Sequence, residues 1–337
     1  MTCRLVLTFL LLAASLGAEL SAAEKEITRD FAVAPGCTLQ IDTQRGDILI
    51  EESERNEVRI AIRIDAVAAS DAAAARLLEQ VQVDLGLHEN QVTIKARNPR
   101  ESGWRFTWSE DERVDFSFRI SVPRECHVDL RAIKGWATVG NLTGRMKARI
   151  EDGGVFFRRI EGTVDARVDY GDVIVSRCSG AVQARVLRGQ IRMGTLGGRA
   201  ELTNATGDIE VMMVRDSIVA ETQVGEIRVG FAPGLAADSR LAVAGGNINA
   251  EFHGQLACRI DAAATWGRVN STLPWTVDSG GSGQRSLVGR LKGGGPLIHL
   301  RASGGSVTLD RSLLLLDGET EPEFASGSDG GRPPRKT

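Results

Sequence analysis

A short motif of alternating apolar residues recurs along the middle of the chain. Each copy reads Gly-x-Ile/Val-x-apolar, with small variations such as Ala137 at the third position. The regular copies are exactly 18 residues apart and begin at Gly135, Gly153, Gly171, Gly189, Gly207 and Gly225. Looser copies begin at Gly246, Gly267 and Gly305, and an outlying first copy begins at Gly46. The constant spacing indicates a structural repeat.

Each 18-residue unit predicts two short strands. Apolar residues occupy positions 3 and 5, a second glycine often holds position 10, and positions 12, 14 and 16 are apolar again. Alternation of period two on either side of a glycine is typical of strand, turn and strand. One unit cannot bury enough apolar surface by itself, so the units must stack. We predict an all-β fold, a parallel β-solenoid in which Val173, Ile191 and Ile209 form one inward column.

The region before the repeats has a different pattern. An Ala-rich segment at residues 71–80 predicts one short helix. Alternating segments predict strands at residues 27–50, 58–64, 92–96 and 116–122. We therefore expect a β-rich N-terminal region at residues 24–122 that caps the solenoid, solenoid repeats at 123–316, and a disordered Gly/Ser/Pro-rich tail at 317–337.

The first 23 residues have the features of a secretory signal peptide. Arg4 precedes an apolar run from Leu5 to Leu16, and the small residues Ser21, Ala22 and Ala23 fit a cleavage site. The run is too short to span a bilayer. We expect export to the periplasm or cell surface of a bacterium, with no transmembrane segment after cleavage.

Composition excludes several kinds of partner and site. The chain has 41 Lys and Arg against 44 Asp and Glu, so no basic excess indicates nucleic acid. Cys37, Cys126, Cys178 and Cys258 are widely spaced, and the histidines are isolated in sequence. These spacings predict neither a metal site nor a cofactor.

One candidate binding surface is a row of arginines. Arg149, Arg167 and Arg185 hold position 15 of consecutive units, so stacking would place them in one outward row. Such a cationic stripe could bind an acidic polysaccharide or a phosphate-bearing polymer. The alternative is an ordinary solvated face, in which Asp165 and Glu201 offset the charge.

A second candidate is an aromatic segment. Trp104, Phe106 and Trp108 alternate along one predicted strand. We expect them to cap one open end of the solenoid, because the core of a terminal coil must be covered. Stacking of these rings on sugars is the alternative.

A pair of carboxylates keeps an enzymatic alternative open. Asp208 and Glu226 share position 2 of adjacent units and would lie ~5 Å apart, a separation that suits a retaining glycosidase. Aspartate beside a turn glycine, however, commonly accepts local backbone hydrogen bonds. We favour the turn role and expect no enzymatic activity, with a polysaccharide-active lyase or glycosidase on a β-helix as the alternative.

Two cysteines share a register as well. Cys37 and Cys126 each precede a repeat glycine by nine residues, since 46−37 and 135−126 are equal. If their strands stack, the residues are near enough for a disulfide. In-register parallel strands point their Cβ atoms the same way, so we favour free thiols. Cys178 replaces Leu or Ile at an inward position and should be a buried hydrophobe.

These features together resemble the bacterial putative-adhesin, or toastrack, β-repeat family. The resemblance is carried by the Val-x-Pro-Gly start of the strand at residues 31–50, Ser121-Val122-Pro123, the 18-residue ladder and the ending Gly293-Gly294-Gly295-Pro296 with Ser303-Gly304-Gly305-Ser306-Val307. It implies a non-enzymatic envelope protein, adhesin-like or a scaffold. We expect the partner of this protein to be a cell-surface polysaccharide or another envelope protein.

Overall fold

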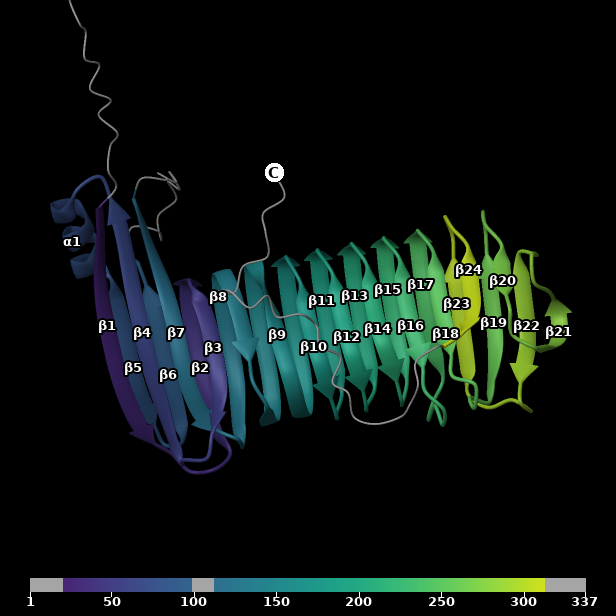
Figure 1. Ribbon diagram of the computed structural model, residues 1–337, viewed down its shortest axis with the longest axis horizontal. Helices are drawn as coiled ribbons and strands as arrows, with labels where there is room; N and C mark the ends of the chain where they lie inside the picture. The colour runs from purple at the N-terminus through teal and green to yellow at the C-terminus, as the bar shows by residue number, and fades with distance from the viewer. Residues whose placement is uncertain (1–20, 99–111, 313–337) are drawn as a thin grey trace, which may run out of the picture.

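The computed structural model describes residues 21–98 and 112–312 and shows an elongated stack of strands (Figure 1). The prediction of an all-β solenoid is confirmed. Strands lie in two facing layers, and each regular repeat contributes one strand to each layer. We call these layers sheet one and sheet two. The strands β8 (Cys126–Val139) and β9 (Leu142–Tyr170) are long enough to contribute to both.

Sheet one begins with antiparallel strands and continues as a parallel ladder. Its order along the molecule is β1, β4, β7, β3, β8, β9, β10, β12, β14, β16, β18, β24 and β20. The bounds are β1 (Ser21–Ala32), β3 (Asp47–Ser53), β4 (Glu57–Ala68), β7 (Arg113–Pro123), β10 (Val173–Cys178), β12 (Ile191–Leu196), β14 (Ile209–Val214), β16 (Ile227–Phe231), β18 (Ile248–Phe252), β20 (Val269–Ser271) and β24 (Val307–Arg311).

Sheet two runs alongside it. The strands β5, β6, β2 and β8 come first, and β9, β11, β13, β15, β17, β23, β19, β22 and β21 follow. The bounds are β2 (Cys37–Arg45), β5 (Gln82–His88), β6 (Gln91–Arg97), β11 (Val182–Arg188), β13 (Ala200–Thr206), β15 (Ile218–Val224), β17 (Ser239–Gly245), β19 (Cys258–Ala264), β21 (Thr276–Gly280), β22 (Ser286–Leu291) and β23 (Leu297–Ala302).

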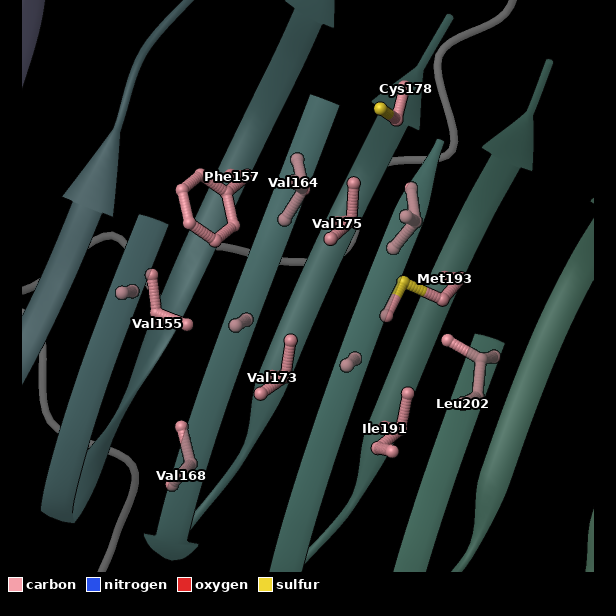
Figure 2. Close-up of a cluster of buried hydrophobic side chains, with 14 of the residues drawn as sticks. Val155, Phe157, Val164, Val168, Val173, Val175, Cys178, Ile191, Met193 and Leu202 are labelled. Carbon is pink, nitrogen blue, oxygen red and sulfur yellow. The ribbon is translucent and has the colours of Figure 1, made fainter. Parts of the chain in front are cut away.

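The core is a set of apolar columns between the two sheets (Figure 2). Val173 pairs with Ile191, Ile191 pairs with Ile209, and all three are fully buried. The predicted inward column is therefore confirmed. Cys178 is 1 % exposed and occupies an inward position, also as expected. Equivalent residues stack because every regular coil has the same length, so the alternation of each strand stays in phase with its neighbours.

The repeat glycines form one corner of the coil. Gly171 has φ of 137°, a conformation that residues with a Cβ rarely adopt. A Cβ at this position would also clash with the carbonyl oxygen of Gly153 in the preceding coil. Glycine is thus required both by the turn and by the close approach of successive backbones.

The last coil of the sequence is not the last coil of the stack. Strand β23 pairs with β17 on one side and with β19 on the other, so it lies between two earlier strands (Figure 1). The corner shows the same order, because Gly305 lies against Gly246 and Gly267 lies against Gly305. This insertion accounts for the 38 residues between the last two copies of the motif: β21 and β22 form a hairpin before the chain returns.

Both ends of the stack carry additional elements. Helix α1 (Asp71–Gln80) coincides with the predicted helix and is capped by Ser70, whose side chain accepts a hydrogen bond from the amide of Ala73. Ala74 and Leu77 are its buried residues, and the helix packs against β1 and β4. Near the other end, the ring of Trp275 lies edge-on to Phe252, with centroids 5.4 Å apart. None of the described helices is long and apolar enough to cross a membrane.

Candidate functional site

A ladder of four arginines lies on the outer face of sheet two. Arg131 pairs in register with Arg149, and Arg167 pairs with Arg185. The strand alternation turns these side chains outward, because Leu130, Ala148, Ala166 and Ala184 beside them are buried. We call Arg131, Arg149, Arg167 and Arg185 the arginine ladder. Adjacent parallel strands are ~4.8 Å apart, so the backbone positions of these arginines follow one another at short, regular intervals.

The arginine ladder is not neutralised by ion pairs to other residues that the structure describes. Within residues 21–98 and 112–312, none of its four side chains forms an ion pair. Carboxylates do lie on neighbouring outward rows, among them Glu151 and Asp169. Asp129, on the same face, is instead 3.9 Å from the ammonium group of Lys147. The guanidinium groups of the ladder thus have no ion-pair partner among the described residues and can bind an external anion.

A groove continues from the C-terminal end of the ladder. It has a volume of about 660 Å³ and crosses the strands from Arg167 and Arg185 to Arg240 and Arg301. Small side chains line it between these arginines, including Thr203, Ala205, Ala242, Ala244 and Ser303. Several outward positions along the groove hold small residues where the coils of the ladder hold arginine or leucine, for example Thr203 in register with Arg185 and Ala205 two positions beyond it.

The two arginines at the far end of the groove are held by carboxylates. Arg301 donates to Asp261 at 2.7 Å, and this hydrogen bond lowers the pKa of the Asp261 carboxyl. Arg240 has a longer ion pair of 3.7 Å with Glu221, and both side chains are more than half exposed. His299 also contacts Asp261, at 3.2 Å, and burial lowers the pKa of its imidazole. Asp261 thus fixes the orientation of Arg301, whereas Arg240 has only a long, exposed ion pair.

The structure brings together the three arginines that the sequence singled out and adds others. Arg131 belongs to the same row and was missed, although it precedes Gly135 by four residues just as Arg149 precedes Gly153. Arg301 was missed because the chain order does not reveal the insertion of β23. The aromatic candidates Trp104, Phe106 and Trp108 lie outside the described residues.

The carboxylates at position 2 have a structural role. Asp208 accepts a hydrogen bond of 2.8 Å from the backbone amide of Glu226 in the next coil. Asp172 makes the equivalent bond, also 2.8 Å, to the amide of Gln190. Each aspartate thus satisfies an amide at the glycine corner of its neighbour. Among the described residues, no group of three or more His, Cys, Asp or Glu side chains is arranged to hold a metal ion.

Cys37 and Cys126 meet at the junction of β2 and β8. The two residues pair in register, both are fully buried, and their sulfur atoms are 3.3 Å apart as free thiols. The predicted stacking of these strands is therefore confirmed. The hydrogen bond between the thiols holds the pKa of Cys37 below its usual value and raises that of Cys126.

Comparison with known proteins finds similarity only among solved structures. No protein-family model matches the chain, and no curated protein does. A putative adhesin from Bacteroides fragilis is 15 % identical, with a TM-score of 0.39 over 86 % of this chain and 97 % of that one. A putative adhesin from Parabacteroides merdae is 13 % identical, with a TM-score of 0.38 over 85 % and 96 %. A protein named putative lipid binding protein, from Parabacteroides distasonis, is 13 % identical, with a TM-score of 0.38 over 84 % and 96 %.

Proposed function

We propose that this protein is an exported, non-enzymatic, adhesin-like envelope protein that binds an anionic surface polymer through the arginine ladder. The observation that carries the proposal is the row of four outward arginines without ion pairs to other described residues. A folded protein gains nothing from aligning like charges on neighbouring strands, since they repel one another. An external polyanion would remove that repulsion.

The regularity of the ladder suits a polymer better than a small ion. Each guanidinium can form paired hydrogen bonds with one carboxylate, sulfate or phosphate group. A chain that carries such groups at regular intervals can engage several arginines at once, and the weak contacts then add up to useful avidity. Because the ladder is solvent-exposed, each contact is screened by salt. We therefore expect binding that depends on both polymer length and ionic strength.

The absence of catalytic activity in this proposal is supported by the position-2 carboxylates. A glycosidase needs one carboxylate free to donate a proton and another free to act as nucleophile or base. The Asp208 carboxylate is instead engaged by the amide of Glu226, and the same bond recurs at Asp172. A hydrogen bond that recurs in this way from coil to coil stabilises the turn at the glycine corner.

Binding of polygalacturonate to the purified protein tests the proposal, with dextran as the neutral comparison. The double variant Arg131→Gln/Arg149→Gln should bind polygalacturonate about tenfold more weakly, because two charge-assisted contacts are lost. Arg177→Gln, on the outer face of sheet one, is the matched control and should bind like the wild type. Equal losses in both variants, or no loss in either, would contradict the proposal.

A further inference from the structure

The groove beside the ladder has a shape and a chemistry that the ladder alone lacks. Five inter-strand steps separate the strands of Arg167 and Arg301, a span of about 24 Å. Arginines stand at both ends, and the only carboxylates among the lining residues are Asp169 and Glu221. The lining therefore carries four positive and two negative charges.

The lining between the arginines is suited to a sugar ring. Thr203, Gln223 and Ser303 present hydroxyl and amide groups that can hydrogen-bond to sugar hydroxyls. Leu187 is 50 % exposed on the same lining, an apolar side chain among charged ones. A pyranose ring has both hydroxyl groups and an apolar face, whereas a polyphosphate chain has neither. The combination favours a carbohydrate over an inorganic polyanion.

The arginines specify acidic groups on that carbohydrate. Arg167 and Arg185 have no ion pair with other described residues, so both guanidinium forks are available. Arg240 is held only by a long, exposed ion pair to Glu221, which an incoming carboxylate or sulfate can replace at little cost. Arg301, by contrast, is fixed by Asp261 and can present a guanidinium edge of defined orientation.

We infer that the groove is a binding site for an acidic oligosaccharide, a segment of about four or five sugars bearing carboxylate or sulfate groups, which lies across the strands from Arg167 to Arg301. This inference rests on the proposed function and assigns the specific subsite within it. The ladder contributes general attraction to a long polyanion, and the groove recognises the sugars themselves.

The experiment measures binding of short oligosaccharides by isothermal titration calorimetry. The probes are tetragalacturonate for the carboxylate arm, a carrageenan tetrasaccharide for the sulfate arm, maltotetraose as the neutral sugar and tetrapolyphosphate as the sugar-free anion. Binding of either acidic tetrasaccharide, with at least tenfold weaker binding of maltotetraose and tetrapolyphosphate, supports the inference. Comparable affinity for tetrapolyphosphate, or for maltotetraose, overturns it, as does failure of both acidic arms to bind.

Variants then locate the binding. Ala244→Trp fills the groove without changing its charge, and it should weaken binding of the acidic tetrasaccharide at least tenfold. Ala181→Trp introduces the same side chain at an exposed alanine outside the groove and should leave binding unchanged. Arg240→Gln should weaken binding, whereas Arg177→Gln, on the outer face of sheet one and outside the groove, should not. Thermal unfolding of each variant checks that the fold is intact.

The two proposals fail in different ways. If Ala244→Trp leaves tetrasaccharide binding unchanged, the groove is not the site, even where the ladder still binds polygalacturonate. A different outcome is that the Arg131→Gln/Arg149→Gln variant binds polygalacturonate normally while Ala244→Trp abolishes tetrasaccharide binding. This result would support the groove as the oligosaccharide site and contradict the proposal that the ladder binds the polymer.

Discussion

At the scale of single residues, this protein depends on positions that look alike in every coil. An inward residue such as Ile191 lies between Val173 and Ile209 in neighbouring strands and is fully buried. A change there affects three coils at once, because each coil is stabilised mainly by its neighbours. A change at an outward residue of the same strands does not disturb the packing of neighbouring coils in this way.

Ile191→Asp should destabilise the protein by several kcal/mol, since a carboxylate in an apolar column loses its hydration without gaining a partner. Thr195→Asp, on the outward side of the same strand, is the matched control and should unfold close to the wild-type temperature. Thermal unfolding followed by circular dichroism measures the difference. Equal unfolding temperatures for the two variants would show that Ile191 is not interior.

The cysteines make a second prediction at this scale. Burial raises the pKa of Cys258 to about 12, so its thiol is almost wholly protonated near neutral pH, and the pKa of Cys126 and Cys178 is raised as well. Alkylation requires an accessible thiolate. We expect these three thiols to resist iodoacetamide in the native protein at about pH 8 and to react after denaturation.

Peptide mapping without reduction completes that measurement. The parallel, in-register strands at Cys37 and Cys126 point both Cβ atoms the same way, and full burial limits access of an oxidant. We therefore expect both thiols to be recovered free from the denatured protein. A linked Cys37–Cys126 peptide from material that was never exposed to added oxidant would show that the pair is a disulfide.

At the scale of elements, the insertion of β23 and β24 decides how the C-terminal half is assembled. The pair lies between β17 and β18 on one side and β19 and β20 on the other. It also brings Arg301 and Ser303 to the groove. The last coil in the sequence is thus needed both for the continuity of the two sheets and for the candidate site.

Gly305→Val tests this insertion. A Cβ at Gly305 would clash with the backbone of Gly246, so the coil could not pack against its neighbour. We expect the free energy of unfolding to fall by about 2 kcal/mol or more. Gly86→Val is the matched control, because an added Cβ at that strand glycine meets no atom within 4 Å. Hydrogen exchange should rise in β17, β19 and β23 of the Gly305 variant. An increase in hydrogen exchange that is confined to β23 would contradict the position of β23 between β17 and β19.

At the scale of the whole molecule, the stack is quasi-one-dimensional, and its stability should vary along its length. Each central strand has a neighbour on both sides, whereas β20 and β21 lie at the end of their sheets. Every residue of β21 is exposed. Local opening costs less where few buried apolar groups are involved.

Native-state hydrogen exchange should therefore be slowest in the central strands β11 to β13 and fastest in β20 and β21. Mass spectrometry of peptides from each coil measures this gradient. A uniform exchange rate along the stack would mean that the protein opens as one cooperative unit, contrary to the nearest-neighbour behaviour expected of a repeat protein.

Much of this arrangement follows from spacing alone. The 18-residue interval determines which residues stack, so the column at Val173, the corner at Gly171 and the row at Arg167 could all be predicted without coordinates. The short helix at residues 71–80 could be predicted as well, because an Ala-rich segment without glycine or β-branched residues favours a helix. These features depend on local pattern and on constant coil length.

Only the tertiary structure decided the order of the last coils and the place of the groove. The motifs at Gly267 and Gly305 are both compatible with stacking on Gly246, and their spacing does not say which one does. The choice depends on how a complete coil packs against two neighbours at once, which no local pattern encodes. The groove follows from that choice, because Arg301 comes from the inserted coil and Arg167 from one that precedes it in the chain by more than a hundred residues.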